Sequence, residues 1–162
     1  MTFQFFPSKP LRLLLPVVCL LSITSCNDLL ETDPKHITDT SDVVITCDAS
    51  QGNKGLLDYE GDVFVHVGLI TSKSEHKDDW RHVKFTWGSR ESMAKATPVK
   101  KNSWSYTIKN IRKYFNVNKD EKIIQLAILF RSGACIDVYC KTLRNTDDSN
   151  MYIPVHDESI NE

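Results

Sequence analysis

Three groups of acidic residues are spaced closely enough along the chain to suggest acid–base chemistry. They are Asp78 with Asp79, Glu60 with Asp62, and Asp147 with Asp148. A glycoside hydrolase needs two carboxyl groups roughly 5 to 10 Å apart on either side of a cleft. All three groups lie in turn-like stretches, where carboxylates are usually solvated, and the sequence has no nucleophile-elbow motif. We therefore expect no catalytic residues and no enzymatic activity.

The cysteines and histidines do not form a metal-binding pattern. The sequence has no CxxC pair and no HExxH motif, and its 5 histidines are scattered. We therefore expect neither a structural zinc ion nor another cofactor. Cys135 and Cys140 are spaced to close a small hairpin disulfide in an oxidising compartment, which would leave an odd thiol.

The composition is that of one globular domain. Of the 162 residues, 41% are hydrophobic and 25% are charged, with 20 Lys and Arg against 21 Asp and Glu. This near-neutral balance excludes a strongly basic nucleic-acid-binding protein. The length excludes a catalytic barrel of about 250 residues. We expect a single domain and no nucleic-acid partner.

The N-terminus has the features of a secretory signal. Lys9 and Arg12 accompany an apolar run over residues 11–21, which is too short to span a bilayer comfortably. Small residues then lead to Cys26, an arrangement that resembles a bacterial lipobox, in which the cysteine is acylated and becomes the new N-terminus. We expect residues 1–25 to be a lipoprotein signal peptide, with an ordinary signal peptide beside a free cysteine as the alternative. A lipid on Cys26 would anchor the protein to a membrane.

Residues 26–42 are rich in Asp and Glu and poor in apolar side chains. This composition predicts a flexible, acidic, solvated tether. Acidic residues directly after an acylated cysteine also resemble the surface-export signals of Bacteroidetes lipoproteins. The segment is therefore interpreted either as an export signal or as a plain spacer.

From residue 43 onward the apolar residues alternate with a period of two, which is typical of half-buried strands. Strands are expected over residues 43–47, 62–68, 80–87, 103–108, 123–131, 135–140 and 151–156. The run 123–131 is nearly continuous and suits a central strand, with a buried helix as the alternative. Only residues 110–115 have a helical pattern, with Asn110 as the N-cap.

This pattern of short strands and turns predicts an all-β fold. We expect an immunoglobulin-like antiparallel β-sandwich of about eight strands with one short helix. The sandwich should cover residues 43–157 and be followed by a tail at 158–162.

Four stretches of the expected sandwich indicate a protein family more specifically in combination than any of them does alone. They are, in order, DASQGNKGLLDYEGDVFVHVGLIT, DDWRHVKFTWG, NSWSYTI and EKIIQLAILFR. In this combination the sequence resembles the N-terminal starch-binding-type β-sandwich module of Bacteroidetes cell-surface α-amylases and related starch-utilisation lipoproteins, over about residues 43–157. Residues 131–150 depart from that family, because they contain two cysteines and no long glycine-rich loop.

The resemblance implies a lipoprotein of the outer membrane, exposed at the cell surface, that binds starch or maltooligosaccharides. Neighbouring starch-utilisation proteins are candidate partners. Binding of an α-glucan requires aromatic platforms beside hydrogen-bonding groups. Trp80 lies out of phase with Val83 and Phe85, the apolar residues of its own expected strand, so it should project away from the core. We therefore expect Trp80 to be the principal platform.

Five further residues are candidates for contact with the sugar. They are Phe64, His66, Lys84, Trp87 and Tyr59. Phe64 and His66 share the non-core side of the preceding strand. Lys84 shares the face of Trp80. Trp87 precedes a glycine that could end the strand, and Tyr59 lies in a loop. Trp104 is in phase with Tyr106 and Ile108 and should pack in the core.

Two alternatives to a standalone glycan-binding protein remain open. One is a scaffold or interaction lipoprotein of the outer membrane that binds no sugar. The other is the remnant N-terminal module of a truncated α-amylase. A glycan-binding protein should display Trp80 and a second aromatic residue on one open surface, whereas a scaffold should bury them.

Overall fold

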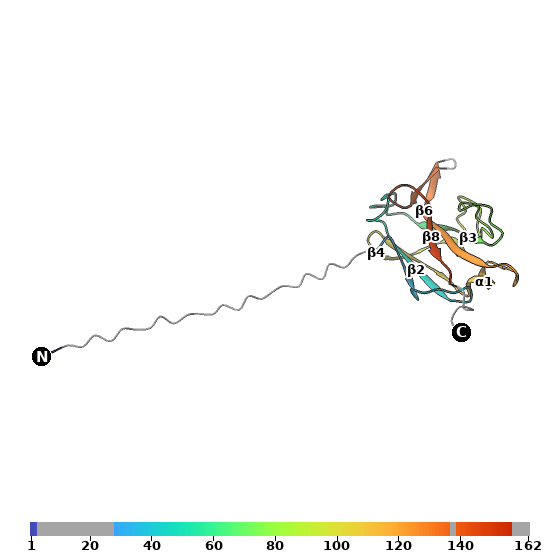
Figure 1. Ribbon diagram of the computed structural model, residues 1–162. Helices are drawn as coiled ribbons and strands as arrows, with labels where there is room; N and C mark the ends of the chain where they lie inside the picture. Colours follow the sequence, from blue (N-terminus) through green and yellow to red (C-terminus); the bar gives the residue numbers. More distant parts are fainter. Residues whose placement is uncertain (3–27, 137–138, 157–162) are drawn as a thin grey trace.

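The computed structural model describes residues 1–2, 28–136 and 139–156 (Figure 1). Within these ranges the chain forms two antiparallel sheets that pack against each other as a β-sandwich. The expected all-β sandwich is therefore confirmed. The predicted lipidation at Cys26, the tail 158–162 and all but the first two residues of the predicted signal peptide lie outside the described residues.

The first sheet has the strand order β1-β2-β5-β4. Its strands are β1 (Leu30–Asp33), β2 (Val43–Asp48), β5 (Ser103–Ile108) and β4 (Thr97–Lys100). In the register of β2 with β5, Ile45 is opposite Tyr106 and Cys47 is opposite Trp104. All four side chains are buried, so this face of the sheet is the inner one.

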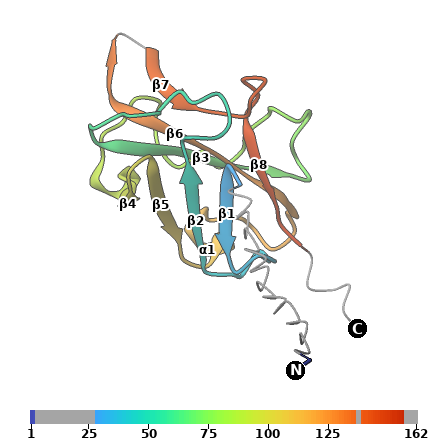
Figure 2. The same cartoon turned by 90° about the vertical axis from the view of Figure 1, so that its left-hand side faces the viewer.

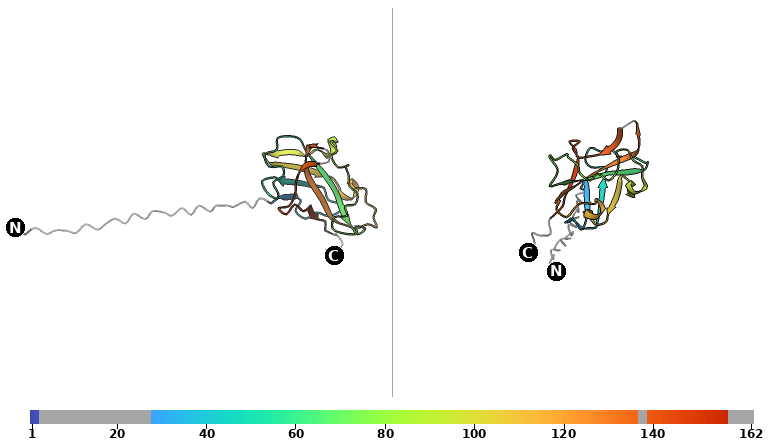
Figure 3. Two further views of the ribbon diagram at one scale, coloured as in Figure 1. Left: turned by 90° about the horizontal axis from the view of Figure 1, so that it is seen from above. Right: turned by 90° about the vertical axis from the view of Figure 1, so that its right-hand side faces the viewer.

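The second sheet is built around one long strand. Its strands are β3 (Val63–Thr71), β6 (Ile123–Ile136), β7 (Tyr139–Leu143) and β8 (Met151–Pro154). β3 pairs with one edge of β6, while β8 and β7 follow each other along the opposite edge. Figure 2 shows β3 and β6 lying across the direction of β1, β2 and β5, and the two views of Figure 3 show the same crossing. The alternative of a buried helix over residues 123–131 is therefore wrong.

The core lies where the inner faces of the two sheets meet. Val65 and Val67 of β3 are opposite Phe130 and Ile128 of β6, and all four are fully buried. Alternation with a period of two along these strands correctly indicated this face. Trp104 faces the core from the other sheet with 5% of its surface exposed, which confirms its expected role in packing.

Both faces of β3 are covered, although the sequence predicted only one buried face. Phe64 and His66 point to the outer face of the second sheet, and Phe64 is only 5% exposed. The covering segment is residues 72–96, which we call the excursion. It contains the 3-10 turn η1 (Ser92–Ala94) and pairs with the free edge of β3 at isolated positions, Leu69 with Arg81 and Phe64 with Lys95.

Residues 80–87 do not form the regular strand that the sequence predicted. The backbone pairs with β3 through Leu69 and Arg81, and the N–H of Lys84 donates to the carbonyl of Val67 at 3.0 Å. His82 has a φ of 51°, in the left-handed region, which interrupts the extended backbone. As a result Val83, expected in the core, is 41% exposed, while Phe85 is buried.

The prediction of a flexible tether over residues 26–42 is wrong for the part that the structure describes. β1 forms an edge strand antiparallel to β2, with Glu31 opposite Thr46. Ile37 is fully buried, and its carbonyl accepts a hydrogen bond from the N–H of His156 at 2.8 Å. The acidic composition suggested a solvated chain, but edge strands commonly carry charged residues on their outer side.

One local prediction is confirmed, and a disulfide that the sequence left open is present. The short helix α1 (Ile111–Tyr114) begins after Asn110, whose side chain accepts a hydrogen bond from the N–H of Lys113 at 3.0 Å. Cys135 and Cys140 form a disulfide across the β6–β7 hairpin, and Cys47 is the free, buried thiol. Among the described residues we find no helix of the length and apolar character needed to cross a membrane.

Candidate functional site

Three of the predicted residues meet on the outer face of the second sheet. The ring of His66 is stacked on the indole of Trp80, with centroids 5.6 Å apart and planes inclined by 21°. The indole of Trp87 meets the same imidazole edge-on, with centroids 5.1 Å apart. Both indoles are partly buried. His66 comes from β3 and the two tryptophans from the excursion, so the cluster forms where the excursion crosses the sheet.

Gly68 allows Trp80 to lie close to β3. A Cβ atom at position 68 would come within 3.4 Å of the indole of Trp80 and 3.1 Å of the carbonyl oxygen of Arg81. Gly68 is two residues from His66, so both face the same side of the strand. The absence of a side chain at Gly68 thus leaves room for the indole beside the imidazole.

Tyr152 of β8 holds Trp80 from the other side. The indole N–H of Trp80 donates to the hydroxyl oxygen of Tyr152 at 3.2 Å, and the tyrosine hydroxyl donates to Asp78 Oδ1 at 2.7 Å. Asn150 Nδ2 donates to the same carboxylate oxygen at 3.3 Å. The hydrogen bond from Tyr152 is the main cause that lowers the pKa of Asp78 below its usual value, so this carboxylate stays ionised at neutral pH.

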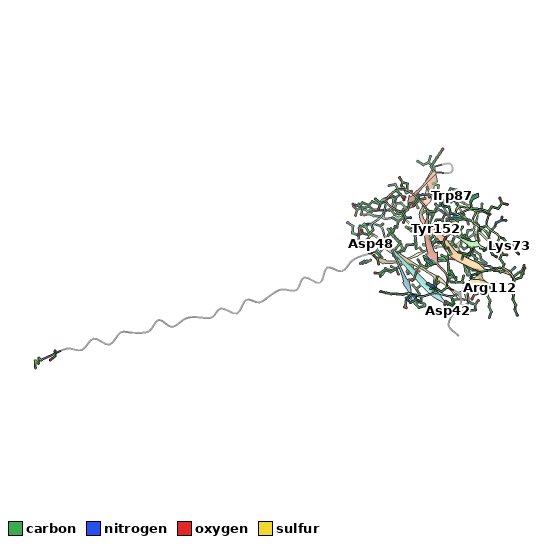
Figure 4. The ribbon with its side chains drawn as sticks, viewed as in Figure 1. Asp42, Asp48, Lys73, Trp87, Arg112 and Tyr152 are labelled. Carbon is green, nitrogen blue, oxygen red and sulfur yellow. A yellow bond between two sulfur atoms is a disulfide. The ribbon has the colours of Figure 1, made fainter. Side chains whose placement is uncertain are left out.

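These groups surround a shallow open hollow of about 250 Å³. Its lining residues are His66, Asp78, Trp80, Trp87, Leu129 and Asn150. We call it the aromatic hollow. Figure 4 shows Trp87 and Tyr152 on the side of the domain that carries β6 and β8, whereas Asp42 lies near the start of β2. The hollow thus combines two indoles with a fixed carboxylate, an amide and an imidazole.

A buried arginine lies behind Trp87. Arg131 of β6 is fully buried, and its guanidinium carbon is 5.6 Å from the ring centroid of Phe64 and 5.9 Å from that of Trp87. Its terminal nitrogens donate to the carbonyls of Ser132 and Ser89. Because Ser89 belongs to the excursion, Arg131 ties the segment that carries Trp87 to the central strand of the sheet.

Two buried side-chain nitrogens of the described part have no hydrogen-bond partner, and both belong to neighbours of Trp87. They are Nδ1 of His66 and Nε of Arg131. Burial is the main cause that lowers the pKa of His66 below its usual value, and the nearby charge of Arg131 lowers it further. The imidazole is therefore neutral at pH 7, which suits a ring that stacks on an indole.

A second anchor fixes the start of the excursion. The side chain of Glu121 is 4% exposed, and its Oε1 accepts hydrogen bonds from the hydroxyl of Thr71 at 2.6 Å and from His82 Nε2 at 3.0 Å. Lys73 Nζ lies 3.2 Å from its other oxygen. The bond from Thr71 is the largest of the causes that lower the pKa of Glu121 to about 2. The carboxylate thus clamps both ends of residues 71–82.

The structure separates the six predicted contact residues into two groups. Trp80, Trp87 and His66 meet at the hollow. Phe64 is not available, because its ring is buried against Arg131. Lys84 and Tyr59 do not line the hollow either, because each contacts another part of the protein.

Lys84 is exposed and faces α1 instead. Its Nζ donates to the carbonyl of Tyr114 at 2.9 Å and lies 4.8 Å from the centroid of that ring. Tyr59 lines a different cavity, beside Trp104 and the β4–β5 turn. Strand parity placed Lys84 with Trp80, but the left-handed backbone of His82 between them breaks that relationship.

Three residues of the site, Asn150, Tyr152 and Arg131, were missed by sequence reasoning, and Asp78 was considered only as a catalytic carboxylate and expected to be solvated. Tyr152 alternates with Met151 and Ile153, which are buried, so its parity already indicated an outward side chain. Arg131 ends a long apolar run, a position where a charge is easily dismissed as solvated. The contacts of Asp78 and Asn150 span 72 residues of sequence, and no local pattern indicates them.

Among residues 28–136 and 139–156 the structure contains no cluster of three or more side chains suited to hold a metal ion. In the comparisons with known proteins, no protein-family model matches the chain, and no curated protein matches it significantly. The function therefore has to be argued from the site itself.

Proposed function

We propose that this protein is a non-catalytic carbohydrate-binding module and that its ligand is an α-glucan, either starch or a maltooligosaccharide. The observation that carries the proposal is the aromatic hollow, in which Trp80 and Trp87 border an open surface beside Asp78 and Asn150. A pyranose ring has an apolar face of C–H groups and a rim of hydroxyls. Indole rings complement the first, and carboxylate and amide groups complement the second. The choice of an α-glucan rests on the sequence resemblance.

The polar groups of the hollow are held in place before a ligand arrives. Asp78 is fixed by Tyr152 and Asn150, and Asn150 is itself held by Arg144 Nη1, which donates to its side-chain oxygen, and by Asn145 Nδ2, which donates to its carbonyl at 2.9 Å. Preorganisation lowers the entropic cost of binding. Asp78 already accepts hydrogen bonds from two donors within the protein. In this proposal it also accepts hydrogen bonds from sugar hydroxyls, and no catalytic role is assigned to it.

The affinity should be low, because the hollow is small and open. An aromatic contact contributes about 0.5 to 1.5 kcal/mol beyond area burial, so two partly exposed indoles imply dissociation constants in the high micromolar to millimolar range. A lipid anchor at Cys26 would place many copies on one surface, where they could bind one polymer together. Such multivalency would make the weak interaction useful.

Affinity electrophoresis in gels that contain amylopectin tests the proposal. The purified wild-type protein should migrate more slowly than in a gel without polysaccharide, and Trp80→Ala should lose most of this retardation. Phe115→Leu is the matched control, because Phe115 is buried in the core and does not line the hollow. A wild-type protein that is not retarded, or a folded Trp80→Ala variant that is retarded equally, would rule out binding of this polymer at the hollow.

A second candidate function is a scaffold that docks another protein. The observation that favours it is the end of the β6–β7 hairpin, where Ile136 is 81% exposed and Tyr139 is 79% exposed beside the disulfide. Exposed apolar side chains of this kind often mark contact surfaces. Changing both to serine should leave amylopectin binding intact. It should abolish co-purification with envelope proteins if the scaffold function is the correct one.

A further inference from the structure

A second cavity of the described chain lies away from the aromatic hollow. It has a volume of about 570 Å³ and is bordered by the loop 58–62 on one side and by residues 98–104 of the β4–β5 hairpin on the other. We call it the loop–hairpin cleft. It shares no lining residue with the hollow. Its size falls within the range of small-molecule binding sites.

The two sides of the cleft are braced against each other. The N–H of Asp58 donates to Asn102 Oδ1 at 2.7 Å, and Lys101 Nζ forms a salt bridge with Asp58 Oδ1 at 2.9 Å. Asp58 and Asn102 both have left-handed backbones, with φ of 54° and 63°. Two such residues that face each other across a cavity, joined by hydrogen bonds, hold its mouth in one shape.

The sides also differ in chemistry. The loop contributes three carboxylates, from Asp58, Glu60 and Asp62, so it presents hydrogen-bond acceptors. The hairpin contributes Lys100, Lys101 and the amide of Asn102, so it presents mainly donors. In the described part Asp62 pairs with Lys95 at 2.8 Å, while no salt bridge is formed by Glu60 or Lys100.

Apolar groups line the cleft between these sides. Tyr59 lies over Gly61, where a Cβ atom would come within 2.4 Å of the tyrosine oxygen, so only glycine allows this position of the ring. Lys141 Nζ is 6.0 Å from the same ring centroid. Pro98, Val63 and the nearly buried Trp104 complete the apolar surface.

We infer that the loop–hairpin cleft is a second saccharide site, which takes a short stretch of the same polymer as the hollow; the choice of this polymer rests on the proposed function. A sugar hydroxyl can donate to a carboxylate on one side and accept from an ammonium or amide group on the other. The apolar C–H face of the sugar meets the tyrosine and proline. A neutral ligand with many hydroxyls therefore matches both sides of the cleft, whereas a purely anionic or cationic ligand would be repelled by one of them.

Titration of the labelled protein with maltoheptaose, followed by two-dimensional NMR, tests this inference. The backbone signals of residues 58–63 and 98–104 should shift in a saturable manner. Glu60→Lys should abolish these shifts, because it places an ammonium group on the acceptor side. Asp120→Lys is the matched control, because it makes the same change of charge on a side chain that is 78% exposed and lines neither site.

The two sites give separate results in this titration. The signals of residues 66, 78–80 and 87 report on the hollow and should respond to Trp80→Ala but not to Glu60→Lys. Shifts at the cleft alone would support the inference and contradict the proposed function of the hollow. Shifts at the hollow alone, or none at all, would overturn the inference, as would cleft shifts that Glu60→Lys leaves unchanged.

Discussion

The indole of Trp80 donates its N–H to the hydroxyl of Tyr152 at 3.2 Å, although the two residues are 72 positions apart in sequence. The excursion and β8 thus meet over the outer face of the second sheet. The same hydroxyl donates a hydrogen bond to Asp78, so one hydroxyl sets the positions of an aromatic platform and of a carboxylate. The geometry of the hollow therefore depends on a residue that does not itself line it.

Removal of that hydroxyl should reduce amylopectin binding strongly and the stability of the fold only slightly. Tyr152→Phe keeps the ring but leaves the Trp80 N–H and Asp78 without this partner. We expect a stability loss of about 1 kcal/mol, typical of one hydrogen bond, and a clear loss of retardation by amylopectin. Thermal unfolding and affinity electrophoresis on the same sample measure the two effects. Unchanged retardation would show that Trp80 and Asp78 keep their positions without Tyr152.

Asp78 should act as an ionised acceptor over a broad pH range. The hydrogen bond from Tyr152 lowers its pKa, so its charge is constant from pH 8 to pH 5, and binding through it should not change in that interval. Asp78→Asn should weaken binding by about tenfold, as expected when a charge-assisted hydrogen bond is replaced by a neutral one. Asp147→Asn, at an exposed carboxylate outside the hollow, is the control. Equal affinity of the Asp78 and Asp147 variants would contradict this role.

Arg131 should affect binding as a positioning residue. It touches Trp87 and holds the carbonyl of Ser89, but it does not line the hollow. Arg131→Met fills similar space without the hydrogen bonds, so we expect faster hydrogen exchange at residues 87–90 and weaker retardation. Arg131→Lys should recover part of the retardation, because an ammonium group can still donate to one carbonyl. A folded Arg131→Met variant with unchanged exchange and unchanged retardation would disprove the positioning role.

Glu121 should stabilise the fold above its unfolded-state pKa. Its folded-state pKa of about 2 lies below the ordinary value of 4.5 for a glutamate, so its contribution is complete above pH 4.5 and is lost as the pH falls towards 2. Glu121→Gln should lower the free energy of unfolding by on the order of 2 kcal/mol at pH 7 and by much less at pH 3. Denaturant titrations at the two pH values measure this, with the exposed Asp120→Asn as the control. If the difference in unfolding free energy between wild type and Glu121→Gln is the same at both pH values, the charge of Glu121 is not the source of the stabilisation.

The sandwich could be predicted from the sequence because its inner faces follow simple alternation. Residues of β2, β3 and β5 expected in the core are buried, and the long apolar run of β6 is the central strand. The site was predicted only in part. Parity correctly brought His66 and Trp80 together across neighbouring segments, but it also selected Phe64, which Arg131 covers.

The remaining errors share one physical cause. Alternation describes how a residue lies in a regular strand, and residues 72–96 are mostly irregular. Once His82 adopts a left-handed backbone, Lys84 no longer lies on the face of Trp80. Likewise, the contacts of Asp78 with Tyr152 and Asn150 are made through tertiary structure, so they could not be found from spacing along the chain.

The excursion packs on the outside of a sandwich whose inner faces are already closed by the two sheets. Only a few of its side chains, such as Phe85 and Ala94, are buried against the rest of the protein. Such an arrangement separates the part of the chain that determines folding from the part that determines recognition. Sequence changes within residues 72–96 could therefore alter which ligand is bound while the strand register is preserved. This makes the domain a suitable framework for selecting new binding specificities from a library varied in that one segment.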